Sequence, residues 1–544
     1  MKDNKVYFLL LLVLLTGLWG CKDYLVEENP SSVTTDFLFN TKDGLQSAVN
    51  GLYSLERAQA DDNESSDFDV VLGDCGTDID FMRAALNQCV ARYRPDLNFP
   101  TQGVVSSWWK KEYRIIERAN SIITFGMAAD VPEADKKKIL REAYIHRANS
   151  FFWLVRKFDN IWLNLEPTTV DNIANRIYSV ATQDEVYKVI IADLDSAISY
   201  YGNDWTARPG QFGLGAALFL RIDVALWRQD WPTAAALSEK LITDGPYALI
   251  DPSLVFTKDA RNNTSEGIYV MQFDEFAVGG ADVSSSTGAP SGHRLPLVFT
   301  ADYKQVPGTS QVSEFGGYGW ARVFPNEYLL SLYNPKYDKR WDAWWQHYYT
   351  YNNETFDFTN QTYKFGDTLK YGQGPMLTGT NFFKNASVGC KKYFDYVKIA
   401  NTTRSFNNIY IYRFSEVYLM AAEANLRMGN TGQALYYLNE LRKKRISAED
   451  PNQILTTMDE ETLLEEHARE LAFEGRRWFF LKRLGLLVER VRASGGTTMF
   501  RGIIATDPAW YSSRSNIKDF HIRWPIPQSE IDAMGGFPQN FGYY

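Results

Sequence analysis

Apolar residues recur three and four residues apart over long parts of this chain, a spacing typical of helices with one buried face. The pattern predicts helices at 45–55, 108–122, 132–158 and 186–197, and a further helix at about 461–484. Pro132 stands in the first turn of the third helix, where the N–H group that proline lacks would have no intrahelical partner. Helices therefore make up most of the predicted regular structure.

A pair of helices joined by a tight turn occurs twice, 200 residues apart. The first pair covers 215–228 and 233–242, and the second is centred on the turn 429–432. Ala234 and Ala434 occupy matching positions, where small side chains let two helices approach closely. The repeat predicts tetratricopeptide-like hairpins, although any tight pair of antiparallel helices favours alanine at such points.

Between these two pairs, at 250–405, the helical periodicity is lost. Glycine-rich and serine-rich stretches such as 279–288 alternate with aromatic clusters, a composition typical of loops and short strands. An unstructured loop of this length is unusual in a compact domain, so we expect an ordered lobe. The predicted fold is mainly α, with a helical scaffold at 41–249 and 406–544 that carries an irregular loop and short-strand lobe.

The N-terminus has the pattern of an export signal. Two lysines precede an apolar run at 6–19, which is too short to span a bilayer and suits a signal peptide. The run ends at Leu18-Trp19-Gly20-Cys21, which resembles a bacterial lipobox. We therefore predict a signal peptide at 1–20 and a tether at 21–40 lipidated on Cys21, which anchors the chain without spanning the membrane. The alternative is an ordinary secretory signal.

Composition excludes several classes of protein. The formal net charge of −9 and the pI near 5.3 disfavour nucleic acid as a partner, because phosphate binding favours a basic surface. The five histidines are scattered and the four cysteines form no CxxC pair, which excludes HExxH metal sites, zinc ribbons and thioredoxin-type redox sites. We expect no cofactor. Cys75 and Cys89 either form a disulfide or stay reduced, with Cys390 free.

Six segments, in order along nearly the whole chain, resemble the RagB/SusD family of Bacteroidetes nutrient-binding lipoproteins. They include WKKEYRIIERANSII at 109–123, the stretch YRFSEVYLMAAEANLRMGN within 408–442, and EEHARELAFEGRRWFFLKR at 465–483. The others lie at 37–53, 141–159 and 524–543. Phe480 departs from the pattern, because the family usually has aspartate there.

The resemblance implies a tetratricopeptide-like scaffold whose irregular lobe binds a nutrient, typically a glycan, at the cell surface. It also implies a lipid-anchored protein of the outer membrane that faces the exterior and delivers its ligand to a SusC-like TonB-dependent transporter. Such a protein is a binding protein and catalyses no reaction. The ligand itself, glycan or peptide, stays open.

The charged residues of the matching helices are expected to be structural. Arg413, Glu416 and Glu423 share one helix face, and Glu470, Glu474 and Arg477 share another. Carboxylates and guanidinium groups alternate there with leucine and alanine, which favours ion pairs between packed helices. A catalytic carboxylate pair, as in a glycoside hydrolase, is the disfavoured alternative because it needs an open cleft. A helical scaffold without a ligand of its own is a third hypothesis.

Two segments combine rings with hydrogen-bonding groups, as sugar binding requires. The first, at 74–99, offers Asp74, Asp78, Asp80, Arg83, Tyr93, Arg94 and Asn98. The second is Tyr318-Gly319-Trp320, where flanking glycines leave ring faces uncovered. Trp344, Trp345, Tyr348 and Tyr349 are a weaker candidate, because they follow the family's structural D-x-R at 338–340 and suit a core. The three aspartates could bind calcium, although solvated loop acids are the favoured interpretation.

Overall fold

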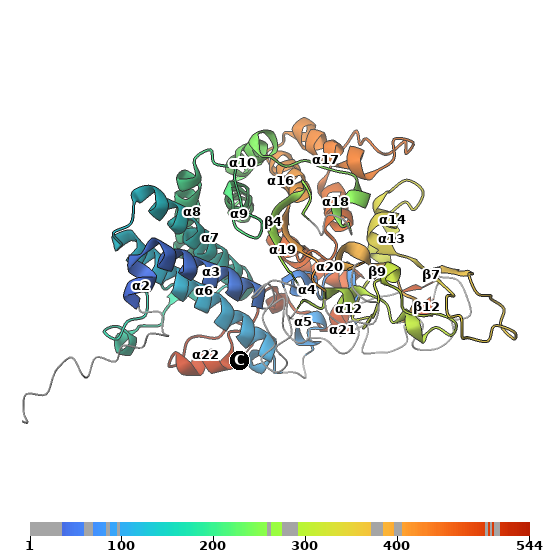
Figure 1. Cartoon of the computed structure of the whole chain (residues 1–544), viewed down its shortest axis with the longest axis horizontal. Helices are drawn as coiled ribbons and strands as arrows, with labels where there is room; N and C mark the ends of the chain where they lie inside the picture. The colour runs from blue at the N-terminus through green and yellow to red at the C-terminus, as the bar shows by residue number, and fades with distance from the viewer. Residues whose placement is uncertain are drawn as a thin grey trace, which may run out of the picture.

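The computed structural model describes residues 35–58, 69–82, 88–94, 98–257, 263–274, 292–370, 385–396, 405–494, 499–500, 503–504 and 512–543. The predicted signal peptide, Cys21 and Arg83 lie outside the described residues. In Figure 1 the N-terminal helices occupy one end of the long axis and the yellow lobe occupies the other. No helix in the described ranges is long and apolar enough to cross a membrane.

The first part of the scaffold is built from long helices, as predicted. They are α3 (Lys42–Ala58), α6 (Gly103–Ala128), α7 (Glu133–Phe158) and α8 (Gln183–Tyr201), preceded by the short α2 (Thr35–Asn40). α8 begins with a capping box, in which the Thr182 and Glu185 side chains each bond the other's backbone N–H. α6, α7 and α8 pack in sequence order, and the rings of Trp108 and Trp153 stack between α6 and α7 at 4.4 Å.

The two predicted hairpins are present and are closed in the same way. α9 (Leu214–Trp227) and α10 (Trp231–Asp244) form the first, and α16 (Phe414–Arg427) and α17 (Thr431–Arg445) the second. In the first turn the Asp230 N–H donates to the Ala225 carbonyl and the Gln229 N–H to Leu226, the Schellman pattern of helix ends. The same two bonds recur 200 residues later, at Asn430 and Gly429.

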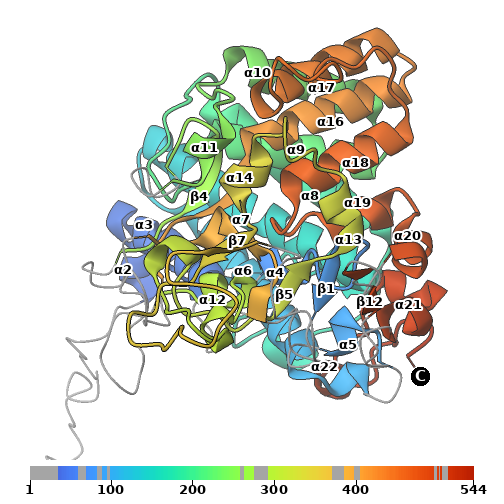
Figure 2. The same cartoon turned by 90° about the vertical axis from the view of Figure 1, so that its right-hand side faces the viewer.

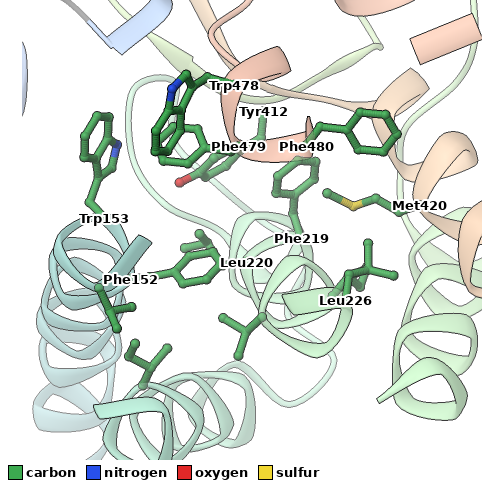
Figure 3. Close-up of a cluster of buried hydrophobic side chains, with 14 of the residues drawn as sticks. Phe152, Trp153, Phe219, Leu220, Leu226, Tyr412, Met420, Trp478, Phe479 and Phe480 are labelled. Carbon is green, nitrogen blue, oxygen red and sulfur yellow. The ribbon is translucent and has the colours of Figure 1, made fainter. Parts of the chain in front are cut away.

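The hairpins pack against each other through α10 and α16, and an aromatic core fills the space beside them. Figure 3 shows rings from α7, α9, β10 and α19 meeting there. Phe219 stacks on Tyr412 at 4.5 Å, and Phe479 meets Trp153 edge-on at 5.1 Å. These contacts join residues from both halves of the chain, so the scaffold halves share one core.

The predicted single helix at 461–484 is wrong, because the structure divides it into α18 (Glu460–Leu471) and α19 (Arg477–Arg483). Phe473 and Gly475 between them have positive φ angles of 61° and 78°, which no α-helix tolerates. The break lets Gly475 approach the backbone at Gly73 so closely that a Cβ on Gly73 would overlap its carbonyl oxygen. Glu474 and Arg477 therefore do not continue the helix face of Glu470.

After α19 the chain forms short helices and a two-stranded ladder. They are α20 (Leu487–Ser494), β11 (Met499–Phe500), β12 (Ile503–Ile504), α21 (Ser512–Asn516), η9 (Asp519–Ile522) and α22 (Gln528–Ala533). Asn540 ties the C-terminal end to the scaffold, because its amide donates to the Trp524 carbonyl at 2.7 Å and also to the Phe158 carbonyl. α22 thereby lies beside α6 (Figure 1).

The lobe consists of short helices and two-stranded antiparallel ladders, as its composition predicts. Its helical elements are α11 (Pro252–Val255), α12 (Leu295–Phe299), η4 (Tyr303–Gln305), η5 (Ser313–Phe315), α13 (Glu327–Ser331), α14 (Arg340–Trp344) and η7 (Lys391–Tyr393). Within the lobe β6 (Trp345–Gln346) pairs with β9 (Gly389–Cys390), and β7 (Tyr348–Thr350) with β8 (Thr368–Lys370). At its boundary β4 (Gly267–Met271) pairs with β10 (Ile409–Arg413), which leads into α16.

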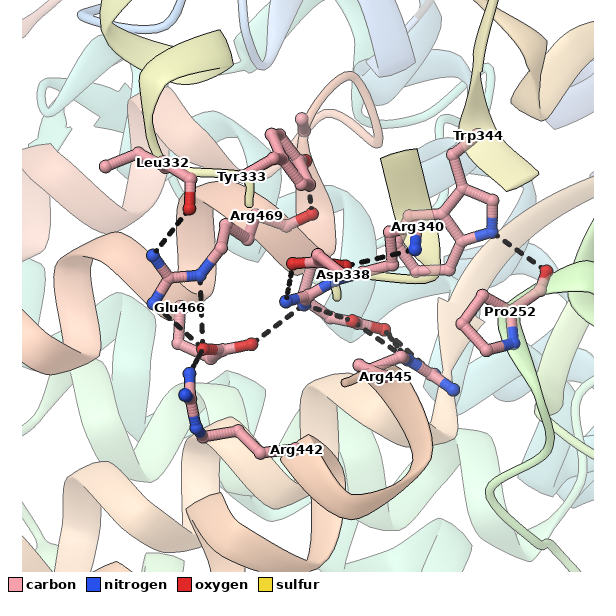
Figure 4. A network of polar contacts seen from close by, with 12 residues as sticks. Pro252, Leu332, Tyr333, Asp338, Arg340, Trp344, Arg442, Arg445, Glu466 and Arg469 are labelled. Atoms are coloured by element: carbon pink, nitrogen blue, oxygen red, sulfur yellow. Dashed lines mark hydrogen bonds and ion pairs between the residues drawn. The ribbon is translucent and has the colours of Figure 1, made fainter. Parts of the chain in front are cut away.

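A buried network of charges fixes the lobe to the second scaffold half (Figure 4). Arg340, which follows Asp338 as the resemblance implies, bonds Asp338 through two nitrogens and also reaches Glu466 and Glu470. Glu470 accepts further bonds from Arg413 and Arg445. Since these side chains are almost fully buried, the prediction that the motif charges form structural ion pairs is confirmed.

Candidate ligand-binding sites

The first predicted segment begins in a turn whose aspartates are bonded to other parts of the protein. Asp74 is 1% exposed, and its carboxylate accepts the backbone N–H groups of Gly475 and Arg477 at the start of α19. Asp80, in β1 (Asp80–Met82), accepts the N–H groups of Thr77 and Gly76. Burial raises the pKa of Asp74 to about 7 and that of Asp80 to about 8, against the opposing effect of these bonds.

Asp78 lies between these two and forms a buried ion pair. Its two oxygens accept bonds of 2.8 Å from Nε and Nη2 of Arg477, and Arg490 approaches at 3.4 Å. Burial acts to raise the pKa of Asp78, but the two guanidinium groups outweigh it and hold the pKa below its ordinary value. Asp78 thus joins the N-terminal third of the chain to α19 and α20.

These positions conflict with the prediction that Asp74, Asp78 and Tyr93 contact a ligand. Tyr93 is 3% exposed, and its hydroxyl donates to the Gly76 carbonyl at 2.7 Å. A side chain whose polar atoms are buried and already bonded has none to offer a soluble ligand. Asn98 is exposed and Arg94 half-buried, so these two stay predictions.

The positions of Asp74, Asp78 and Asp80 fit neither the calcium hypothesis nor the favoured alternative of solvated loop acids. No group of three possible metal-ligating side chains gathers within the described part of the chain. Nor are Asp74, Asp78 and Asp80 solvated loop acids, because all three are buried. Of the two states left open for the cysteines, the structure shows the reduced one, with Cys75, Cys89 and Cys390 buried and free.

The structure brings the second predicted segment next to the first. β5 (Val323–Pro325) pairs with β1, which places Val323 opposite Met82. Just before β5, the N–H groups of Trp320 and Arg322 donate to carbonyls of α12, at Leu297 and Val298. These bonds hold the segment 316–322, which we call the ring loop, against α12.

Glycines let the ring loop fit this position. Gly316 and Gly317 have positive φ angles of 87° and 68°, which favour glycine. A Cβ on Gly319 would overlap the carbonyl oxygen of Ala301. The Val312 carbonyl accepts both the Gly317 N–H and the hydroxyl of Tyr303, whose buried ring stacks on Tyr349 at 4.9 Å. The loop is therefore tied to a buried pair of rings.

The rings of the ring loop are half-buried and lie beside cationic groups. The Lys304 ammonium is 3.9 Å from the centre of the Tyr318 ring. The guanidinium groups of Arg294 and Arg322 lie 5.5 Å and 5.4 Å from the Trp320 ring. Cation–π attraction holds such groups near a ring face and leaves N–H donors beside it. The ring loop combines apolar stacking surface with hydrogen-bond donors.

The third aromatic group is core, as the sequence favours. Trp344, Trp345 and Tyr349 are at most 1% exposed, and the Trp344 indole N–H donates to the Pro252 carbonyl (Figure 4). Tyr348 differs, because it lies on the outer side of β7 and is 41% exposed.

A cavity that sequence reasoning missed lies on the scaffold. It has a volume of about 380 Å³ and is lined by side chains of α6, of the segment 162–178 and of α22. Trp109, Tyr113 and Glu530 belong to motifs that we assigned to the scaffold, so their second surface went unnoticed. The sequence feature that could have revealed the cavity is the row of cations Lys110, Arg114 and Arg118, which lie beside these rings and are exposed in the structure.

Comparison with known proteins identifies the family. A model of the SusD family matches residues 287–543, and a model described as "Starch-binding associating with outer membrane" matches residues 23–217. The chain belongs to the RagB/SusD family. Family membership confirms the resemblance seen in the sequence motifs and agrees with the mainly helical, tetratricopeptide-like fold.

Individual members of the RagB/SusD family align over most of the chain. SusD-like protein P2 of Formosa agariphila is 27% identical over 509 residues, which cover 89% of this chain and 91% of that protein. A SusD homolog from Bacteroides thetaiotaomicron has a TM-score of 0.71 at 21% identity, covering 92% of this chain and 97% of that structure. Surface glycan-binding protein A from the same organism, in complex with laminarihexaose, has a TM-score of 0.69 at 20% identity, covering 92% and 99%.

Proposed function

We propose that this protein captures an oligosaccharide or polysaccharide at the cell surface and delivers it to a SusC-like TonB-dependent transporter without catalysing a reaction. The observation that carries the proposal is the ring loop, where Tyr318 and Trp320 are half-buried beside Lys304, Arg294 and Arg322. The apolar C–H face of a sugar ring stacks on such rings, and its hydroxyls accept hydrogen bonds from cationic neighbours.

Two further findings support a saccharide as the ligand class. The family model that matches residues 23–217 is described as starch-binding, and one structure of similar fold holds laminarihexaose. Arg94 and Asn98 are proposed as additional contacts, together with Arg83, which lies outside the described residues. A peptide ligand is the alternative within the same function.

A lipid on Cys21 and a position on the outer face of the outer membrane complete the proposal. An acylated cysteine followed by the charged residues Lys22, Asp23, Glu27 and Glu28 would tether the folded chain to the membrane surface. Protease added to intact cells should then degrade the protein, and a Cys21→Ala variant should be released from the membrane fraction. Full protection from protease would contradict surface display.

Calorimetric titration with laminarin-derived, starch-derived and peptide ligands tests the binding proposal. The Tyr318→Ala/Trp320→Ala variant should bind the preferred saccharide at least tenfold more weakly, since the loss of about 1.4 kcal/mol of stacking changes Kd tenfold. Tyr436→Ala is the matched control, because Tyr436 is 53% exposed on α17, far along the chain from the ring loop.

The other two hypotheses predict different results in the same experiment. Release of reducing ends that a single carboxylate substitution abolishes would show a glycoside hydrolase. No heat of binding across the whole panel, together with co-purification of a transporter, would show a scaffold without a ligand of its own. Unchanged affinity in the Tyr318→Ala/Trp320→Ala variant would move the site away from the ring loop.

A further inference from the structure

The cavity on the scaffold lies away from the ring loop. In Figure 1, α6 and α22, which line it, lie apart from α12, which supports the ring loop, along the long axis; Figure 2 looks along that axis and draws α12 in front of α6. Its volume of about 380 Å³ falls within the range of about 300–1,000 Å³ that is typical of small-molecule sites.

One wall of the cavity is aromatic and firmly held. Tyr113 and Trp162 exchange two hydrogen bonds, because the Tyr113 hydroxyl donates to the Trp162 carbonyl and accepts the Trp162 N–H. Their rings lie 6.1 Å apart and nearly parallel, and the Tyr178 ring meets Trp162 at 4.7 Å and 58°. Tyr178 is 37% exposed, so this wall offers a ring surface to solvent.

The lining of the cavity also carries positive charge. Lys110, Arg114 and Arg118 are exposed and follow one another at four-residue spacing along α6, which places them on one helix face. Lys110 is 3.5 Å from Glu530, and a fourth cation, Arg176, is 3.7 Å from Glu117. Within the described ranges Arg114 and Arg118 form no hydrogen bond or ion pair, so the cavity keeps two uncompensated guanidinium groups.

We propose that this cavity is a second binding site, which takes a saccharide unit bearing an acidic group, either a carboxylate or a sulfate. The sugar ring would stack on Tyr178, and Arg114 and Arg118 would bind the anion. Guanidinium groups suit both anions because their paired N–H donors match two oxygens. The site rests on the proposed function in its ligand class, but uses none of the residues of the ring loop.

A protein partner is the alternative occupant, because the segment beside Tyr178 exposes apolar residues. Ile173 is 62% exposed and Ile177 is 82% exposed. An exposed apolar surface favours protein contacts. The hollow between α6 and α22 is instead lined by aromatic rings and by the guanidinium groups of Arg114 and Arg118, and its volume suits one or two sugar rings. The cavity therefore favours the saccharide, and the apolar segment becomes an outcome of the test.

Calorimetric titration with three oligosaccharides tests the site: a carboxylated oligogalacturonide, a sulfated galactan oligosaccharide and neutral maltohexaose. An acidic oligosaccharide should bind, and Arg114→Gln/Arg118→Gln should weaken it at least tenfold, with a weaker salt dependence than the unsubstituted protein shows. Tyr178→Ala should weaken it as well. The acid that binds more tightly identifies the group recognised, and either result supports the site.

Lys137→Gln/Lys138→Gln is the matched control, because it removes two exposed charges from α7 outside the cavity lining. It should leave acidic binding unchanged, as should Tyr318→Ala/Trp320→Ala. If Tyr318→Ala/Trp320→Ala loses affinity for neutral glycans only, or if no neutral glycan binds the unsubstituted protein, the result concerns the ring loop. Neither result contradicts the cavity site. Three results would overturn the site: no acidic oligosaccharide binds, all variants lose affinity equally, or Arg114→Gln/Arg118→Gln loses only a protein partner.

Discussion

The segment 74–82 and the ring loop are joined by the β1–β5 ladder, yet they use polar and aromatic side chains in opposite ways. In the first, Asp74 and Asp78 turn inward and bond groups of α19. In the second, Tyr318 and Trp320 stay half-buried, because backbone bonds and not side chains fix the loop. Side chains that hold the fold together are not available to a ligand. Side chains that the fold does not need for its own contacts can bind one.

The largest expected effect comes from breaking the inward-facing segment. Arg477→Ala should lower the free energy of unfolding by about 3–5 kcal/mol, because it leaves the Asp78 carboxylate buried with only Arg490 at 3.4 Å. Urea unfolding measures the loss. Arg492→Ala, which removes the exposed 3.1 Å pair with Asp519, is the control and should change stability little. Equal effects in both variants would show that burial of Asp78 is not what matters.

A smaller effect is expected from disturbing the backbone of the ring loop without touching its rings. Gly319→Ala places a methyl group against the Ala301 carbonyl, which should cost about 1–3 kcal/mol and displace the loop. Saccharide affinity should fall in titration while Tyr318 and Trp320 remain. Gly432→Ala, with open space around its Cβ in α17, is the matched control and should not weaken binding.

The protonation of Asp80 should make the free energy of unfolding depend on pH. Because its pKa in the folded state, about 8, lies above the unfolded value, its stabilisation is complete below the unfolded pKa and is lost as pH rises through about 8. Between pH 5 and 8.5, roughly, unfolding free energies should fall with pH more steeply in the unsubstituted protein than in Asp80→Asn. Parallel urea-unfolding curves against pH for the two proteins would contradict this assignment.

The smallest expected effect is that of a reductant. Since Cys75, Cys89 and Cys390 are free and buried, reductant should leave the Tm unchanged in a Cys21→Ser background. Burial raises the thiol pKa of Cys75 well above its ordinary value, so a thiol reagent should label none of the three in the folded protein. All three should react in denaturant without reductant. A single reactive thiol would reveal a Cys75–Cys89 disulfide.

The helical hairpins were predictable because their signals are local. Alanines, tight turns and apolar spacing around Ala234 and Ala434 suffice to predict both pairs. The break at Phe473 was not predictable, since its positive φ belongs to a residue that rarely adopts one and depends on the approach of Gly73. The burial of Asp74 depends on N–H groups about 400 residues later, which no local pattern contains.

The candidate sites divide in the same manner. Glycines around Tyr318 and Trp320 indicated uncovered rings, and that signal lies within five residues. The cavity combines Arg114 with Tyr178 and Glu530, which only the folded chain brings to one place. Pattern reasoning assigned each of those helices a single, structural role, whereas a helix has an outer face as well as a buried one.

The packing of α10 on α16 and the pairing of β4 with β10 bring the two ends of the lobe to neighbouring points. A module whose entry and exit lie together can be replaced without stretching what surrounds it, because the cost of closing a loop grows slowly with its length. The scaffold can thus accept a different lobe between the same two attachment points. Exchanging the segment between β4 and β10 for that of a relative, with Asp338 and Arg340 kept as well as Glu266, Arg413 and Arg445 so that the buried charge network is rebuilt, is a direct route to altered ligand preference.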